Sequence, residues 1–117
     1  EFLEDRSIRN RDDAIAISEG EFDHSFLLAP DASAIDWPAT RVEDIDDAAI
    51  ALLLPMKPAL VVLGTGSRQR LPPARIAAEF LRRGIGLEAM DNAAAARTYN
   101  LLAAEGRRVI AAFLLPG

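Results

Sequence analysis

Cysteine is absent from the 117-residue chain, which excludes disulfide bonds, thiolate metal sites and cysteine nucleophiles. Long apolar runs are absent as well. No segment approaches the ~20 apolar residues that a membrane-spanning helix needs. The first residues also lack the basic and apolar regions of a secretory signal peptide. We therefore expect a soluble, cytoplasmic protein without a transmembrane segment.

What is present is the composition of one globular domain. Hydrophobic residues make up 50% of the chain and charged residues 26%, which is typical of a folded protein rather than a disordered one. At this length a single domain can bury a substantial core. We assign residues 1–13, which are polar and charged, to a flexible arm and residues 14–117 to the domain.

The net charge of −5 is divided unevenly along the chain. Residues 1–56 hold 14 acidic residues and 4 arginines, whereas residues 57–117 hold 4 acidic and 9 basic residues. Overall acidity argues against binding to nucleic acid, which needs a basic face. The basic half leaves room for a small anion or an acidic partner. Alternatively, the two halves neutralise each other across the fold.

The first part of the domain predicts an antiparallel hairpin. Residues 14–18 and 22–28 have the composition of strands, and Glu19-Gly20 is a turn signal between them. A period of two places alternate residues of the second strand on one buried face. These residues are Phe22, His24, Phe26 and Leu28. We expect residues 30–39 to form a loop.

A helix is predicted after this loop. Thr40 is the expected N-cap, because Glu43 follows at the spacing of a capping box. The acidic residues of the first turns suit the positive end of the helix dipole. Pro55 and Pro58 end the helix, since proline disrupts a helix interior.

Residues 60–115 predict the order strand–helix–strand–helix–strand. The strands are apolar runs at 60–63, 87–90 and 109–115, and such runs suit central strands covered on both faces. Short connections between these elements favour right-handed crossovers and parallel pairing. We therefore predict a three-layer α/β domain with a mixed, mostly parallel sheet, on which the N-terminal hairpin packs.

The two helices of this unit have clear boundaries. The first begins at Pro72-Pro73 and ends near Gly84. The second, residues 93–105, is capped by Asp91 or Asn92 and ends at Gly106. The apolar spacing of the first helix predicts a buried face made of Ile76, Ala77, Phe80 and Leu81.

An anion site is predicted where the two loops leave the carboxyl ends of their strands, since ligands favour this edge of a parallel sheet. Arginines there can surround the exposed N–H groups of two helix N-termini. The candidate residues are Gly64, Thr65, Gly66, Arg68, Arg70, Asn92 and Arg97. The glycine spacing matches neither the dinucleotide nor the Walker fingerprint. The alternative is a tight turn with Arg68 and Arg70 paired to the acidic half.

No catalytic residues, metal ligands or cofactors are assigned. The single histidine, His24, falls on the apolar strand face, and no G-x-S-x-G elbow is present for a hydrolase triad. The carboxylates at residues 43–47 fan around a helix start instead of converging as a calcium loop does. We leave enzymatic activity open and favour a non-enzyme.

Three stretches, in this order and spacing, resemble a known family: LGTGSRQRLPP (63–73), GIGLEAMD (84–91) and AARTYNLLAAEGRRVIAA (95–112). The family consists of small single-domain proteins of unknown biochemical function in bacteria and archaea, including archaeal MTH-type proteins. Its mitochondrial relative is assembly factor three of respiratory complex I. The resemblance covers about residues 14–115 and implies a three-layer domain with no established activity and no required cofactor. The matched glycines, arginines and Tyr99 have no assigned role in the family.

Two functions are carried forward. The leading one is a non-enzymatic interaction or assembly module, whose protein partners include subunits of a membrane complex if the resemblance extends to function. The alternative is a small anion or metabolite binding protein that uses the Gly64–Arg70 loop and Arg97. The oligomeric state is left open, as a monomer or a weak dimer, and a stand-alone structural domain that associates with itself is kept as a weaker option.

Overall fold

The computed structural model describes residues 9–10, 15–17 and 20–115. In chain order the strands are β1 (Arg9–Asn10), β2 (Ile15–Ile17), β3 (Gly20–Phe22), β4 (Phe26–Ala29), β5 (Ala32–Asp36), β6 (Leu60–Gly64), β7 (Gly86–Met90) and β8 (Val109–Phe113). The helices are α2 (Asp47–Ala51), α3 (Ala74–Arg82) and α4 (Asn92–Ala104), with short 3₁₀ turns η1 (Val42–Asp44) and η2 (Leu54–Met56).

The described strands form two sheets. A small sheet has the order β1-β2-β3, and a five-stranded sheet has the order β5-β4-β8-β6-β7. β6 runs parallel to both β7 and β8, whereas β4 is antiparallel to β8 and to β5. The predicted strand–helix–strand–helix–strand unit and the mixed sheet are therefore confirmed.

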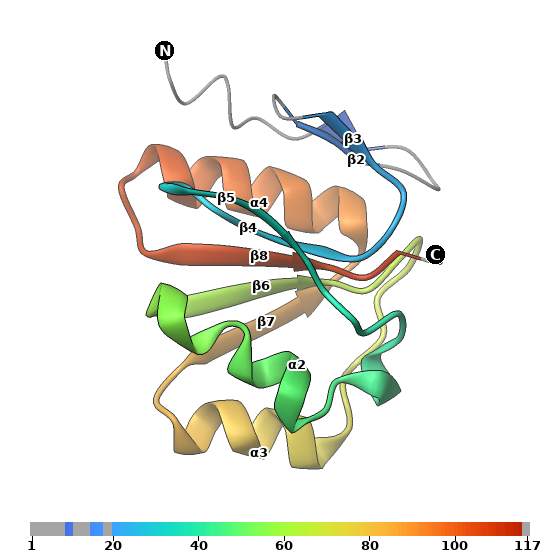
Figure 1. Cartoon of the computed structure of the whole chain (residues 1–117), viewed down its shortest axis with the longest axis vertical. Coiled ribbons are helices and arrows are strands. Elements are labelled where there is room, and N and C mark those ends of the chain that lie inside the picture. The colour runs from blue at the N-terminus through green and yellow to red at the C-terminus, as the bar shows by residue number, and fades with distance from the viewer. Residues whose placement is uncertain (1–8, 11–14, 18–19, 116–117) are drawn as a thin grey trace.

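The five-stranded sheet is the middle of three layers, with α4 on one face and α2 and α3 on the other (Figure 1). Successive residues of a strand point to opposite faces, so each central strand contributes to two cores. On β8, Ala111 and Phe113 pack in the same core as Tyr99 of α4. Ile110 and Ala112 belong to the core beneath α2 and α3. The predicted three-layer domain is thereby confirmed.

The N-terminal hairpin packs on this domain over α4 (Figure 1). β2 and β3 pair antiparallel, and Ile15 and Ile17 are buried in the same core as Tyr99. Most of the predicted arm, residues 1–13, lies outside the described residues. Arg9–Asn10 lie within them and form β1, which pairs with β2.

The second strand of the predicted hairpin, residues 22–28, is divided between the two sheets. β3 ends at Phe22, and β4 begins at Phe26 beside β8. The predicted alternation is wrong here, because both faces of β4 are covered and residues 25–29 are all buried. His24 lies at the bend between the strands with 47% of its side chain exposed. It is therefore not part of a buried strand face, although its ring contacts the ring of Phe22 edge-on.

The predicted loop at residues 30–39 is also wrong in part, because it contains β5. This strand pairs antiparallel with β4, with Leu27 opposite Ile35 and Phe26 opposite Asp36. Its sequence, Ala-Ser-Ala-Ile-Asp, has little local strand preference. Backbone hydrogen bonding to the buried strand β4 stabilises the extended conformation that these side chains alone favour only weakly.

The predicted helix start at Thr40 lies further along the chain in the structure. Asp46 caps α2, and its side chain accepts a hydrogen bond from Ala49 N–H at 2.9 Å. The Thr40 hydroxyl instead donates to the Asp44 carboxylate at 3.1 Å. Ile45 is buried between η1 and α2, and the chain must break its helical path there to place this side chain in the core.

The boundaries of α3 and α4 are as predicted, but two features of this half differ. Asp91 caps α4, and the glycines after both helices have positive φ. However, β7 is an edge strand and not a central one. In α3 the buried residues are Ile76 and Phe80, whereas Ala77 and Leu81 are exposed.

Candidate functional site

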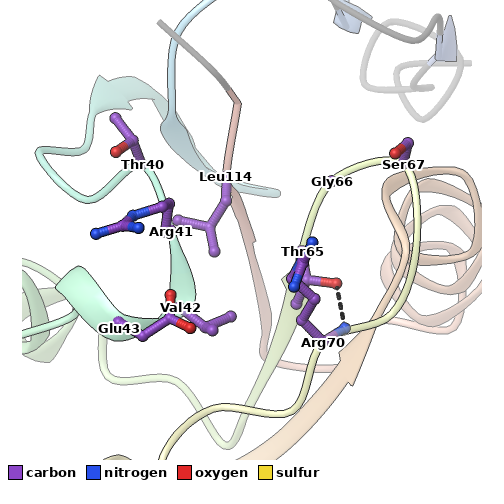
Figure 2. Close-up of a pocket in the computed structure, with 9 residues that line it drawn as sticks. All are labelled: Thr40, Arg41, Val42, Glu43, Thr65, Gly66, Ser67, Arg70 and Leu114. Carbon is purple, nitrogen blue, oxygen red and sulfur yellow. Dashed lines mark hydrogen bonds between the residues drawn. The ribbon is translucent and has the colours of Figure 1, made fainter.

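A cavity of about 550 Å³ lies at the carboxyl ends of β6 and β8 (Figure 2). One wall is the segment 40–43, which includes the first residues of η1. The other wall is the loop 65–70 after β6. Leu114, which follows β8, lines the cavity between these walls (Figure 2). The predicted edge of the sheet therefore does carry a hollow. Its first wall comes from a segment that the capping-box spacing at Thr40 and Glu43 predicts to be the start of a helix.

Gly64 and Asn92 lie against each other, and their contact packs the start of α4 against the end of β6. Asn92 is 3% exposed, and its side-chain amide bonds to both neighbouring strand ends. It accepts a hydrogen bond from Gly66 N–H at 3.2 Å and donates one to the Leu114 carbonyl at 3.1 Å. A Cβ on Gly64 would collide with Asn92 Oδ1 and would lie 2.9 Å from Phe113 Cδ1. Glycine is therefore needed so that the amide can reach the strand end.

Thr65 organises the loop that forms the second wall. Its hydroxyl donates to the Arg68 carbonyl at 2.8 Å and accepts a hydrogen bond from Arg70 N–H at 3.0 Å. Its own N–H donates to the Met90 carbonyl at 2.8 Å and so ties the loop to β7. Because the hydroxyl is engaged by these bonds within the loop, the geometry assigns Thr65 the role of holding the loop in its conformation.

Of the three arginines of the predicted site, one lines the cavity. Arg70 lines the cavity, whereas Arg68 and Arg97 are exposed and do not appear among its lining residues. Arg41 lines the opposite wall and was missed in the sequence. Its guanidinium points away from Arg70 in Figure 2.

Arg41 is held outward by Asp44, with its Nε 3.5 Å from a carboxylate oxygen. Hydrogen bonding to Arg41, and then to Thr40, holds the pKa of Asp44 below its ordinary value. The positive charge of Arg41 on this wall is therefore already paired with the Asp44 carboxylate. Glu43, which also lines the cavity, adds an acidic group that does not favour an anion.

The N-terminus of α4 is occupied by the protein's own carboxylate. Asp91 Oδ1 accepts a hydrogen bond from Ala94 N–H at 2.8 Å, and the Asn92 N–H donates to the Gly66 carbonyl at 2.8 Å. A second anion at this position would meet the charge of Asp91. The geometry therefore moves the centre of any anion site away from α4 and toward Arg70.

His24 contacts carboxylates on both sides of its ring. Nε2 lies 2.8 Å from Asp36 Oδ1 and Nδ1 lies 3.3 Å from Asp23 Oδ1. Hydrogen bonding to Asp36, followed by that to Asp23, raises the pKa of His24 above 6.5. No serine or threonine hydroxyl is bonded to this ring in the described part of the chain. The same residues contain no group of three or more His, Cys, Asp or Glu side chains placed so that they could hold a metal ion.

A second hollow, of about 420 Å³, lies between α3 and β7 and is lined by apolar residues. We call it the α3–β7 groove and define it by Leu71, Pro72, Ala77, Phe80, Leu81, Ile85, Gly86, Leu87 and Ala89. Leu71 and Leu81 are 74% and 80% exposed. Large apolar side chains that remain this exposed beside a hollow are typical of a surface that binds another molecule. The sequence pattern does not reveal this groove, because Leu81 has the spacing of a core residue on α3.

Residues 9–114 match the family described as a protein of unknown function (DUF498/DUF598). The chain belongs to this family. A Bordetella pertussis protein described as a Mth938-like domain has the same fold, with a TM-score of 0.80 and 31% identity over 99% of this chain and 88% of that one. The predicted family resemblance is thereby confirmed.

Two curated relatives have names that bear on function. NADH dehydrogenase [ubiquinone] 1 alpha subcomplex assembly factor 3 of Danio rerio is 33% identical over 84 residues, which is 70% of this chain and 48% of the relative. The chain thus spans about half the length of this assembly factor. The 13 kDa major membrane protein of Francisella tularensis subsp. holarctica is 31% identical over 93 residues, 77% of this chain and 74% of that protein. Among the described residues of this chain, no helix is long and apolar enough to cross a bilayer.

Proposed function

We propose that the chain is a non-enzymatic interaction module that takes part in the assembly of a membrane-bound respiratory complex, NADH:ubiquinone oxidoreductase being the first candidate. The observation that carries this proposal is the relatedness, over 70% of this chain, to a protein named as an assembly factor for that enzyme. The matching segment is 84 residues long and covers 70% of this chain, so we propose that the shared function resides in this α/β domain.

Two surface features support a role in binding proteins. The α3–β7 groove exposes large leucines next to a sheet edge, which favours contact with an apolar partner surface. The net positive charge of residues 57–117 favours an acidic partner. We propose that the chain works from the cytoplasmic side and reaches the membrane complex through its protein partners.

Affinity purification tests this proposal. The chain is tagged in its native cell, soluble and membrane fractions are processed separately, and co-purifying proteins are quantified by mass spectrometry. Enrichment of oxidoreductase subunits over an untagged control supports the assembly role. An Arg68→Ala/Arg97→Ala double variant locates the contact: loss of the subunits places it at the basic loops. Failure of the wild-type chain to enrich any of these subunits contradicts the proposal.

A second candidate function is the binding of a small anion beside the Gly64–Arg70 loop. The 550 Å³ cavity next to Arg70 favours it, although Glu43 opposes it. Phosphate at millimolar concentration should raise the melting temperature, and Arg70→Ala should remove the effect. Arg68→Ala is the second variant, because the sequence alone points to that residue. An unchanged melting temperature with phosphate would exclude the anion site.

A further inference from the structure

One edge of β7 is unpaired. The strand is the last in the order of its sheet and pairs with β6 alone among the described strands. Gly86 N–H donates to the Ala59 carbonyl at 3.0 Å, and the Met90 carbonyl accepts from Thr65 N–H at 2.8 Å. In a parallel pair the backbone groups that face the neighbour recur at every second residue. Residues 86, 88 and 90 therefore face β6.

The backbone groups of Leu87 and Ala89 must then point away from the sheet. The Gln69 side chain donates a hydrogen bond to the Ala89 carbonyl at 2.9 Å, from outside the edge. This contact confirms that the Ala89 carbonyl points away from β6. The Gln69 amide takes the place that the backbone N–H of another strand would occupy. The N–H groups of both residues and the carbonyl of Leu87 are left in position to pair with an incoming strand.

The α3–β7 groove runs along the same edge. The side chains of Leu87 and Ala89 line it from the strand, and Phe80 and Leu81 line it from α3. Because side chains alternate along a strand, a segment added to β7 would place every second residue in this groove. Backbone hydrogen bonds and apolar burial would thus act on one segment together.

Basic residues lie at both ends of the groove. At one end Leu71 is preceded by exposed Arg70, which also lines the 550 Å³ cavity. Exposed Arg82 and Arg83 follow Leu81 at the other, where both pair with Glu79. Asp47 also acts on Arg82 electrostatically, but the two guanidiniums hold more N–H donors than Glu79 can accept, so donors remain for an incoming carboxylate. The groove is therefore apolar along its length and basic at its ends, which complements an apolar segment with acidic flanks.

A second copy of this chain fits the edge poorly. Full antiparallel overlap of two β7 strands centres the pairing on Glu88, because Leu87 and Ala89 must face each other's copies. Each Glu88, which is exposed, would then lie directly opposite its equivalent. Like charges directly opposite destabilise a strand pair, and the basic ends of the two grooves would repel as well.

We propose that β7 and the α3–β7 groove bind an extended segment of a partner protein as an added strand. The segment has apolar residues at alternate positions that enter the groove, a neutral or basic residue opposite Glu88, and acidic residues at both ends. This inference rests on the proposed function as an interaction module and names where and how the partner is held.

Two variant pairs separate this mode of binding from any other. Ala89→Pro removes an outward N–H while keeping an apolar side chain, and proline is tolerated on the exposed side of an edge strand. Ala89→Val keeps the N–H and is its control. Leu81→Glu places a charge in the groove at a residue that is 80% exposed, and Leu101→Glu, at a residue 61% exposed on α4, is its control. Circular dichroism verifies that all four variants fold.

Purified protein gives the direct test. The probe is a short peptide of alternating valine and threonine with two glutamates at each end, followed by ¹⁵N–¹H NMR. We expect shifts at the Leu87 and Ala89 amides, and binding weaker by about tenfold or more for Leu81→Glu, for Ala89→Pro and for a peptide with lysines in place of the glutamates. Unperturbed Leu87 and Ala89 amides, or equal binding of the lysine peptide, would overturn the inference.

The cell experiment distinguishes failure of this inference from failure of the proposed function. If oxidoreductase subunits co-purify with the wild type and both controls but are lost with Ala89→Pro and Leu81→Glu, both proposals are supported. If the subunits co-purify equally with all five proteins, the assembly role stands and the edge site is wrong. If no subunit co-purifies with the wild type, the assembly role fails and the NMR result alone decides on the groove.

Discussion

Replacing Asn92 by alanine should destabilise the protein substantially, because its amide joins three segments. It bridges Gly66 N–H, after β6, and the Leu114 carbonyl, after β8, from the first turn of α4. The side chain belongs to a residue that is 3% exposed. Alanine would leave both backbone groups without this partner.

The expected cost follows from these two bonds. A buried polar group that loses its partner costs roughly 1–3 kcal/mol, so two such groups set an upper limit of about 6 kcal/mol. Gly66 and Leu114 also line the 550 Å³ cavity, so water can satisfy part of the loss. Alanine also favours the helix by a few tenths of a kcal/mol. We therefore expect a loss of about 2–3 kcal/mol.

Urea denaturation at equilibrium measures this loss directly. The m-value should stay unchanged while the midpoint falls. Asn92→Asp is the matched variant: it keeps the acceptor for Gly66 N–H but opposes a carboxylate to the Leu114 carbonyl at neutral pH, and it should cost at least as much as alanine. Gln69→Ala, which removes one exposed hydrogen bond, should change stability by less than about 0.5 kcal/mol. A cost below about 1 kcal/mol for Asn92→Ala would refute its structural role and return it to the candidate ligands.

Three further predictions concern a close packing contact, a helix cap and an ion pair. Gly64→Ala should cost at least about 2 kcal/mol in urea denaturation, because the added Cβ meets Asn92 and Phe113 in a packed core; unchanged stability would show that α4 can move away at little cost. Asp46→Ala should cost about 1 kcal/mol, since Asp46 and not Thr40 caps α2; Thr40→Ala should cost less, and the reverse order would contradict the assigned cap. The raised pKa of His24 means that its contacts with Asp36 and Asp23 stabilise the fold below the ordinary pKa of 6.5 and lose this effect as pH rises through the raised value. Asp36→Asn should therefore lower the melting temperature at about pH 5.5 and have little effect at about pH 8.5; an equal decrease at both would assign Asp36 a role that does not depend on His24.

The sequence predicted the second half of the fold because its signals are local. Leu60-Val61-Val62-Leu63 is a buried strand by composition, Asp91 is a cap by type and position, and the glycines after α3 and α4 occupy the φ values that only glycine adopts easily. Each of these features is decided within a few residues, so tertiary contacts reinforce the local preference instead of overriding it.

The missed features depend on neighbours that are distant in sequence. β5 is a strand because β4 offers it a buried partner, and β7 is an edge because of the order in which strands enter the sheet. Leu81 has the spacing of a core residue on α3, yet α3 lies at the margin of the sheet and leaves it exposed. The α3–β7 groove arises because β7 is an edge strand and because α3 leaves Leu81 exposed beside it.

The arrangement of residues at the candidate site follows from the sequence only in part. The rule for strand ends places Gly64, Thr65, Gly66 and Asn92 near one another, and in the structure they bond to one another or to the strands beside them. It could not reveal that segment 40–43 forms the opposite wall, because no local signal links that segment to β6. Nor does a helical position such as Arg97 say which way its side chain faces relative to a neighbouring loop.

The most direct test of the central claim is the amount of assembled NADH:ubiquinone oxidoreductase in a host that carries both this chain and the enzyme. The gene for the chain is deleted, and the assembled complex is measured by native electrophoresis with in-gel activity. We predict that the deletion lowers the amount of complete complex and that the wild type and Ala89→Val restore it, whereas Ala89→Pro does not. An unchanged amount of complete complex after the deletion would contradict the claim that this domain serves its assembly.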